Sequence, residues 1–477
     1  MMYKTQQIRL TDAINNETRN FLVLLCEQAS KLSNQVVYSI RQKHFETCER
    51  VEFFDKDGFY RSEFKTKKVS VDSYASLCKE FANSEHYQIM GGQQAQQTIR
   101  SVIESFRSYN ELLPLFFNGE LKGFPCIPGY RKDGLTVVTF PGQAVKLDIE
   151  TGMCRLAISR ELSKDILNDV WIPGGYGFKP HQLVEVRILP RNRELYAEYV
   201  YKSGNDDVSC LLGLDHSQAL GIDPGTNNWL TCVSTLGKSF IIDGRQIKSL
   251  NTNYNRKVKK IKTGKPQGFW NDQLADLTEL RNRQMRDAIN KTARFIVNYC
   301  LNHKIGNVVF GWGEGVKDKI TLGKRNNQNF VQIPTSKLKE RILTLCEEIG
   351  IQFTETEESY TSKTSFLDGD FLPKLGEKPE SWKPSGKRVK RGMYKTKNNL
   401  VINADCNGAA NILVKVKTQL GLCLAKVIRE ILTVPKRYNV FGSLKKIYRK
   451  RSEARFYLAS LHQFRIPSAL ARGEVKL

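Results

Sequence analysis

The spacing of apolar residues changes character along the first half of the chain. Residues 2–10 alternate as one strand, and residues 19–46 carry apolar side chains at helical spacing. Further helices are predicted near 71–84 and 93–113. From about residue 124 the pattern has period two, which predicts strands at 135–140, 144–150, 154–159, 183–190 and 194–202. This half therefore predicts a small β-barrel that a helical insertion interrupts.

The second half alternates strands with helices. An apolar run ends at Asp223, enters a Pro-Gly-Thr-Asn-Asn turn and resumes as a second apolar run, which predicts a hairpin. The segments that follow are a basic stretch at 253–265, a long amphipathic helix at 269–304, a buried strand at 305–313, a helix at 336–350, a strand at 351–359 and a helix from 402. This order is typical of a mixed α/β layer fold.

Two aspartates stand at the ends of these elements. Asp223 closes a strand, where sheet enzymes place reactive groups, although an isolated Asp-Pro-Gly more often caps its own turn. Asp405 lies in the first turn of a helix that Asn403 can cap, where a carboxylate also favours the helix dipole. It shares one helix face with the apolar or small residues Ala409 and Ile412, so this face can approach a sheet closely.

Composition narrows the choice of partner. The formal charge is +25, from 74 Lys and Arg against 49 Asp and Glu, which favours a polyanion, and nucleic acid is the first candidate. An anionic membrane surface is the alternative. The sequence shows no apolar run of spanning length and no signal segment, so we expect a cytoplasmic protein. The 11 cysteines are dispersed without a C-x-x-C pair and the 6 histidines lack ligand spacing, so no zinc is expected.

Four motifs give the fold a more specific interpretation. They are GIDPGTNNWLTCVS, NVVFGWGEGVKD, YTSKTSFLDGD and NADCNGAANIL, in that order between about residues 215 and 415. Together they resemble the RuvC-like nuclease core of the TnpB family, the OrfB proteins of transposons, and of the related Cas12 effectors. The resemblance implies an α/β RuvC-like (RNase H-like) nuclease domain and an amino-terminal wedge β-barrel with a helical recognition insertion.

The same resemblance implies domain divisions. They are a first barrel strand at 1–12, a helical recognition domain at 13–120, the rest of the barrel at 121–215, the first part of the nuclease core at 216–362, a basic insertion at 363–400, the last core motif at 401–418 and a basic tail at 419–477.

It also implies an activity and its partners. The expected activity is RNA-guided cleavage of double-stranded target DNA, with a guide RNA from the flanking transcript, and the expected setting is the prokaryotic cytoplasm, close to the nucleoid. A monomer is favoured. A Cas12-type CRISPR effector, a guided DNA-binding repressor with little or no cleavage, and a transposase that acts without RNA are the alternatives.

The resemblance assigns Asp223 and Asp405 as metal ligands. Carboxylates that converge from different elements repel one another unless cations lie between them, so two Mg²⁺ ions are expected. Relatives carry a third carboxylate, a glutamate, directly after the apolar run of this strand, and Gly311 occupies that place here. Glu358, at the end of the next strand, is the preferred substitute, and Glu314 is the other. A site without a third carboxylate stays open, because the stretch around Glu358 also suits a solvated edge strand.

The insertion at 363–400 departs from the family as well. Relatives typically carry two zinc-binding cysteine pairs there, whereas this chain has no cysteine between Cys346 and Cys406. The insertion must therefore hold its shape by packing or by contact with nucleic acid, with Trp382 and Tyr394 as candidate anchors. The predicted phosphate-contacting residues are Lys387, Arg388, Lys390 and Arg391 in the insertion and Arg256 and Lys257 in the basic stretch. A solvated charged loop is the alternative for the insertion.

Overall fold

The computed structural model describes residues 2–54, 59–64, 67–162, 169–203, 213–313, 333–390 and 392–442. The chain forms two compact units, one built from Met1–Asn205 and the other from Asp206–Leu461. Glu314 and Arg391, two of the predicted site residues, lie outside the described residues.

The first unit contains two antiparallel sheets. The larger has the strand order β1-β9-β8-β4 and consists of β1 (Met2–Arg9), β9 (Glu194–Ser203), β8 (Leu183–Arg191) and β4 (Val138–Pro141). The smaller consists of β5 (Val145–Asp148), β6 (Met153–Leu156) and β7 (Val170–Pro173). The strand pairings of the described residues thus define two sheets, and the closed barrel stays a prediction.

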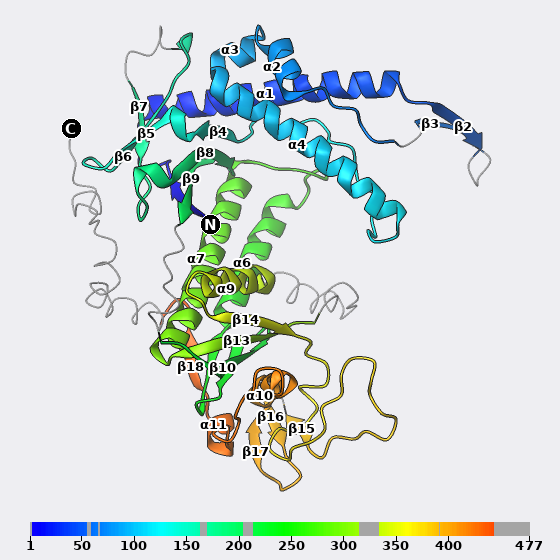
Figure 1. Ribbon diagram of the computed structural model, residues 1–477, viewed down its shortest axis with the longest axis vertical. Helices are drawn as coiled ribbons and strands as arrows, with labels where there is room; N and C mark the ends of the chain where they lie inside the picture. Colours follow the sequence, from blue (N-terminus) through cyan, green and yellow to red (C-terminus); the bar gives the residue numbers. More distant parts are fainter. Residues whose placement is uncertain are drawn as a thin grey trace. The chain divides into compact units, whose positions relative to one another are not determined.

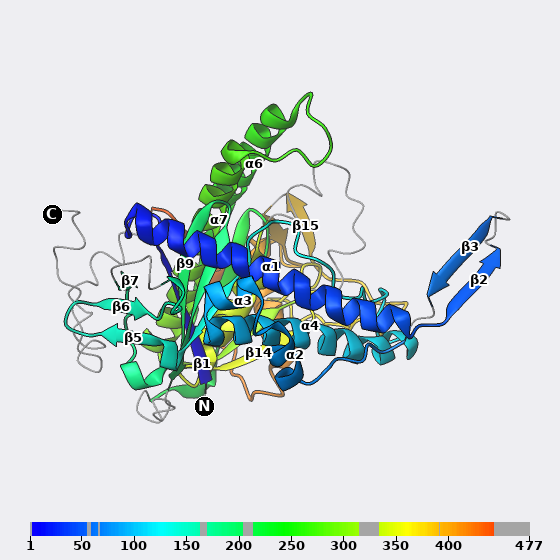
Figure 2. The ribbon, with the colours of Figure 1, turned by 90° about the horizontal axis from the view of Figure 1, so that it is seen from above.

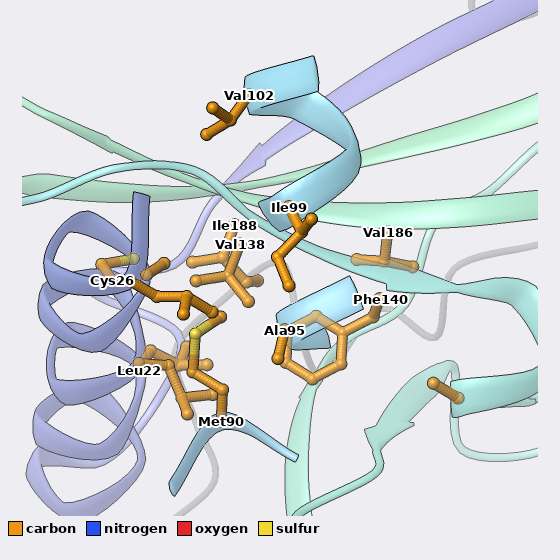
Figure 3. Packing of buried hydrophobic residues seen from close by; sticks show 14 of the residues in the cluster. Leu22, Cys26, Met90, Ala95, Ile99, Val102, Val138, Phe140, Val186 and Ile188 are labelled. Atoms are coloured by element: carbon orange, nitrogen blue, oxygen red, sulfur yellow. The ribbon is translucent and has the colours of Figure 1, made fainter. Parts of the chain in front are cut away.

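Helices cover the larger of these sheets. They are α1 (Asn16–Glu46), α2 (Tyr74–Phe81), α3 (Glu85–Met90) and α4 (Gly92–Phe117). The side chain of Asn15 caps α1 by accepting the Thr18 N–H at 2.8 Å. Figure 3 shows how Leu22 of α1, Ile99 of α4 and Phe140 of β4 point into one buried core. A two-stranded ribbon, β2 (Arg50–Phe54) with β3 (Tyr60–Phe64), follows the end of α1 (Figure 2). The sequence predicted α1, α2 and α4 but missed α3, β2, β3 and β7.

The second unit is built on a six-stranded mixed sheet (Figure 1). Its order is β14-β13-β10-β11-β12-β18, from β10 (Asp215–Pro224), β11 (Asn228–Ser234), β12 (Lys238–Asp243), β13 (Ile305–Gly311), β14 (Gln352–Thr356) and β18 (Lys436–Asn439). Strand β11 is antiparallel to both of its neighbours, β10 and β12, whereas β13 is parallel to both β10 and β14. All seven residues of β13 are buried, as expected of a parallel strand that helices cover on both faces.

The two faces of this sheet pack against different helices. Leu220, Ile222 and Phe310 share a core with α7 (Asp272–Asn302) and α9 (Thr335–Glu347). Ala219 and Val309 share the opposite core with α10 (Ala404–Val416). Successive strand residues alternate between faces, so Asp223, like Ala219, belongs to the α10 face.

Three further elements complete the second unit. The segment 253–265, which the sequence analysis left without a secondary structure, lies largely within α6 (Arg245–Lys262), and α6 lies beside α7 in both Figure 1 and Figure 2. Helix α11 (Arg429–Thr433) precedes β18. The insertion carries an unpredicted sheet of β15 (Lys387–Lys390), β16 (Met393–Lys395) and β17 (Val401–Asn403). No helix among the described residues has the length and apolar character needed to cross a bilayer.

Candidate functional site

Asp223 stands at the carboxyl end of β10, opposite Thr231 in the hairpin with β11. The turn-capping alternative requires its carboxylate to accept a backbone N–H of the turn, and among the described residues it accepts none. The carboxylate instead lies against α10, where a Cβ added at Gly408 would come within 2.7 Å of Asp223 Oδ2. Glycine at position 408 therefore makes the close approach of helix and carboxylate possible.

The electrostatic surroundings of Asp223 are unfavourable for a negative charge. Burial raises the pKa of Asp223 well above its usual value, and the negative charges of Glu358 and Asp405 raise it further, while Arg388 acts in the opposite direction. The structure therefore brings together the three carboxylates that the sequence analysis singled out, from β10, from the end of β14 and from α10.

Asp405 lies in the first turn of α10, and the side chain of Asn403 caps this helix as predicted, by accepting the N–H groups of Asp405 and Cys406 at 3.0 and 3.1 Å. The Asp405 carboxylate has two polar partners. Its Oδ2 accepts a hydrogen bond from Asn228 Nδ2 at 2.6 Å, and its Oδ1 accepts one from Arg388 Nη2 at 3.0 Å. Asp405 thus faces the hairpin turn and the insertion, in addition to any interaction with its own helix dipole.

The two glutamates after β14 differ in their surroundings. Glu357 pairs with Lys415 of α10 and accepts the Ser359 N–H at 2.8 Å. Burial opposes its ionisation, but these hydrogen bonds outweigh burial and lower the pKa of Glu357. At Glu358, burial and the neighbouring Glu357 charge raise the pKa. Of the two, Glu358 is the carboxylate whose charge the described residues leave unbalanced.

Gly311 occupies the position of the family glutamate and lies against α10. A Cβ added at Gly311 would lie 2.4 Å from Cδ1 of Ile412, which projects from α10, so a larger residue at this position would require the end of the isoleucine side chain to move. Gly311 pairs with Thr356 of β14, two residues before Glu358. The end of β14 therefore lies beside the position that lacks the glutamate.

Two buried asparagines of α10 hold the segment that follows Glu358. Asn407 donates to the Thr364 carbonyl at 2.8 Å and accepts the Phe366 N–H at 3.0 Å, while Asn411 donates to the carbonyls of Thr361 and Thr364. Both asparagines thus orient the backbone that follows Glu358, because their amides pair with its peptide groups.

The insertion is held by carboxylates at the place where relatives bind zinc. Asp368 Oδ2 accepts hydrogen bonds from Ser365 Oγ at 2.6 Å, Ser385 Oγ at 3.0 Å and Lys397 N at 2.9 Å. Asp370 Oδ2 accepts the backbone N–H groups of Ser365 and Ser385 at 3.0 and 2.9 Å. We call this group the Asp368–Asp370 hub. It joins three separate parts of the insertion, as a metal ion with ligands from each part would.

Both aromatic residues predicted as anchors contact other residues of the insertion. Tyr394 is fully buried, and its hydroxyl donates to the Lys363 carbonyl at 2.8 Å. Trp382 donates to the Phe371 carbonyl at 2.8 Å and packs edge-on against Tyr360.

The predicted phosphate-contacting residues fall into two groups. Lys387 and Lys390 are exposed on β15, and Arg256 and Lys257 are exposed on α6. Arg388 is partly exposed, but its guanidinium contacts Asp405. Among the described residues no group of three or more His, Cys, Asp or Glu side chains lies close enough to hold a metal ion as it stands. A cation at the three carboxylates must therefore displace Arg388 and draw the side chains together.

The donor set nevertheless suits a hard divalent cation. Three carboxylates supply only oxygen ligands, which Mg²⁺ prefers, and burial together with neighbouring negative charges raises the pKa of two of them, Asp223 and Glu358.

Comparison with known proteins bears on the fold and the family of the chain. A family model, OrfB_IS605, described as a probable transposase, matches residues 214–313, which is less than half of the chain. No curated protein matches the chain. Among solved structures, a Cas12f1 in complex with sgRNA and target DNA is 13% identical, with a TM-score of 0.50, and covers 86% of this chain and 98% of its own.

Two other structures are similar over most of their length. The mini-RNA-guided endonuclease CRISPR-Cas_phi3 is 10% identical with a TM-score of 0.42, covering 91% of this chain and 94% of its own. A CRISPR-Cas12f ternary complex is 15% identical with a TM-score of 0.30, covering 83% and 82%. We base the fold assignment on the Cas12f1 structure alone.

The sheet order, the helices on both faces and the likeness to Cas12f1 define an α/β fold of the RuvC-like class. The family model confirms the resemblance that the motifs indicated: over residues 214–313 the chain is similar to the OrfB proteins, the TnpB-like family, and its fold is similar to that of Cas12f1.

Proposed function

We propose that this protein is an RNA-guided, Mg²⁺-dependent DNA endonuclease of the TnpB type, encoded by a transposon. The observation that carries the proposal is the convergence of Asp223, Glu358 and Asp405 at one end of the central sheet, where burial and mutual repulsion raise the pKa of Asp223. Such a concentration of carboxylates in a partly buried place is unfavourable unless a cation offsets their charge.

In this proposal the three carboxylates hold two Mg²⁺ ions, which would activate water and stabilise the departing oxygen of the phosphodiester. Asp223 contributes a ligand fixed by β10 and by its contact with Gly408. Glu358 contributes the ligand that relatives place at the position of Gly311. Asp405 contributes a ligand from α10 once Arg388 has left its Oδ1.

The guide RNA and the target DNA are the proposed partners. Helix α6 has seven Lys or Arg residues and no acidic residue, and its companion α7 holds it through Tyr254 and Thr278, whose hydroxyls are 3.0 Å apart. At the end of this helical pair Trp270 is 53% exposed, with Lys262 Nζ 5.8 Å from its ring. Phosphate contacts from Arg256 and Lys257 together with base stacking on Trp270 suit nucleic acid and carry no sequence preference. The Cas12f1 structure, a complex with sgRNA and target DNA, supports these partners.

Plasmid cleavage tests the proposal. The protein is co-expressed with its flanking transcript, purified, and incubated with a plasmid that carries the matching target, with and without Mg²⁺. Wild type is compared with Asp223→Ala, Glu358→Ala and Glu314→Ala. We expect cleavage that requires Mg²⁺ and that Asp223→Ala and Glu358→Ala abolish. Loss in Glu314→Ala with activity retained in Glu358→Ala would assign the third carboxylate to Glu314.

A guided repressor without cleavage is the second candidate, and Gly311 is the observation that favours it. The glutamate that the family resemblance implies is missing there, and the end of the Ile412 side chain lies against the glycine. Guided binding of the plasmid without any cleavage in Mg²⁺ would establish the repressor. Cleavage or strand joining that survives complete removal of RNA would instead favour a transposase.

A further inference from the structure

The hydrogen bond from Asn228 to Asp405 is itself held by a partner from the end of the chain. Asn228 Oδ1 accepts a hydrogen bond from Arg437 Nη1 at 2.8 Å, while Asn228 Nδ2 donates to Asp405 Oδ2 at 2.6 Å. Arg437 lies on β18, at the edge of the sheet, outside the four motifs and outside the residues that the family model matches. A polar chain thus runs from β18 through the hairpin turn to α10.

The chemistry of these groups allows only one orientation of the amide. A guanidinium can only donate hydrogen bonds and an ionised carboxylate can only accept them. Arg437 therefore requires the Asn228 oxygen to face it, and this turns the Asn228 nitrogen towards Asp405. Without Arg437 the amide is free to rotate, and its oxygen would then repel the carboxylate.

Arg437 is itself anchored independently of this chain of contacts. Its Nη1 lies 3.4 Å from Asp243 Oδ2, and Asp243 is buried. Asp243 also accepts hydrogen bonds from Arg245, from the backbone N at 2.9 Å and from Nε at 3.0 Å. Because Arg245 satisfies Asp243, removing the Arg437 side chain leaves no bare buried charge, and the sheet edge is expected to stay folded.

We propose that Arg437 is a positioning residue for the Asp405 carboxylate and acts through the amide of Asn228. The proposal rests on the metal-binding role of Asp405 proposed above. Holding Oδ2 against a neutral donor fixes the rotamer of Asp405 and presents Oδ1 to a cation. Contacts of this kind, one step removed from the ligand, typically change metal affinity about 10- to 100-fold.

The test measures Mn²⁺ binding, by electron paramagnetic resonance, to the full-length chain freed of nucleic acid. The variants are Arg437→Ala, Asn228→Ala and the double variant, and thermal unfolding verifies that each is folded. Lys436→Ala is the matched control, because it removes the same charge from the neighbouring residue of β18, whose side chain instead lies 5.3 Å from the ring of Tyr438. Arg437→Lys keeps the charge and loses the planar guanidinium.

We expect Arg437→Ala and Asn228→Ala each to weaken Mn²⁺ binding about 10-fold. The double variant should lose no more than either single variant, because both changes break the same chain of contacts. Lys436→Ala should bind as wild type does, and Arg437→Lys should recover only part of the loss.

Three results would contradict the proposal. Wild-type affinity in Arg437→Ala shows that Arg437 does not position Asp405, and an equal loss in Lys436→Ala shows that only charge matters. Multiplicative losses of about 100-fold in the double variant show that Arg437 does not act through Asn228. Absence of Mn²⁺ binding in wild type has a different meaning, since it removes the proposed metal site and this inference with it.

Discussion

The second unit contains two groups of carboxylates with opposite properties. At the candidate site, burial and the charges of Glu358 and Asp405 raise the pKa of Asp223. In the Asp368–Asp370 hub, burial also opposes ionisation of Asp368, but hydrogen bonds from Ser365, Lys397 and Ser385 outweigh it and lower the pKa of Asp368. Both groups lie between segments that are distant in sequence, so position in the fold does not explain the difference.

The number of donors explains it. The hub surrounds its carboxylates with hydroxyl and backbone N–H donors. Because these donors stabilise the ionised carboxylates, the carboxylates hold the parts of the insertion together. The candidate site leaves Asp223 without a described donor and gives Asp405 one neutral donor and one cation that can move. A group of carboxylates with enough hydrogen-bond donors therefore stabilises the fold. A group without enough donors retains electrostatic repulsion, which a bound cation can relieve.

The largest effect is expected at the unsatisfied group. Asp223→Ala and Asp405→Ala should each reduce guided DNA cleavage more than about 100-fold, beyond the loss typical of residues one step removed from a metal. Gel-shift assays at fixed salt should show that binding of the guided target is unchanged, because neither carboxylate attracts phosphate. Equal losses of binding and cleavage would show that these residues act on the fold and not on the chemistry.

The neighbouring glutamates sharpen the comparison within one segment. Glu358→Gln should reduce cleavage more than about 100-fold, because it removes a proposed metal ligand, while raising or preserving thermal stability, because it removes an unbalanced, partly buried charge. Glu357→Gln is the matched control and should retain most activity but lose stability, since it breaks the pair with Lys415. If Glu357→Gln instead lost cleavage and Glu358→Gln lost only stability, the third metal ligand would be Glu357.

The hub should respond as a structural element. Asp368→Asn leaves donors at Ser365, Ser385 and Lys397 without a charged acceptor, which is expected to destabilise the insertion by about 1–3 kcal/mol. Limited proteolysis and thermal unfolding measure this loss, and Lys383→Ala in the same insertion is the control. A zinc chelator should change neither measurement in wild type, and release of zinc with unfolding would refute the account of the hub.

The smallest effects are opposite pH dependences. The raised pKa of Asp223 contributes to the stability of the fold at pH values below the ordinary pKa of aspartate, near 3.9. This contribution is lost as pH rises through the raised pKa. The lowered pKa of Asp368 contributes to the stability of the fold at pH values above the ordinary pKa of aspartate. This contribution is lost as pH falls through the lowered pKa.

Thermal unfolding in EDTA between pH 4 and pH 8 therefore separates the two groups. Asp223→Asn should raise stability relative to wild type most at the upper end of this range, whereas the deficit of Asp368→Asn should shrink towards the lower end. Parallel curves for both variants would show that the two groups do not differ in the way described.

Much of the fold was predictable because its elements have strong periodic signals. The strand pair around Asp223, the buried strand before Gly311 and the helix that carries Asp405 all have long apolar patterns. Short elements with exposed or polar residues escaped prediction, among them β15, β16 and β18, because their stability comes from partners elsewhere in the chain.

The sequence predicted the acidic residues of the candidate site but not the residues that form hydrogen bonds with them. Family motifs and strand ends indicate Asp223, Asp405 and Glu358, while Asn228 and Arg437 gain their roles only through contacts 177 and 209 residues apart. The FLDGD sequence contains both aspartates of the hub, but only the fold brings Ser385 and Lys397 to them.

Metal binding by the nucleic-acid-free chain tests the central claim most directly. Mn²⁺ is titrated into wild type, Asp223→Asn and Asp368→Asn, and bound ions are counted by electron paramagnetic resonance. The account predicts that wild type and Asp368→Asn bind Mn²⁺ and that Asp223→Asn loses this binding while gaining thermal stability without metal. Binding that persists in Asp223→Asn, or that disappears in Asp368→Asn, would contradict the assignment of the metal site to the unsatisfied carboxylates.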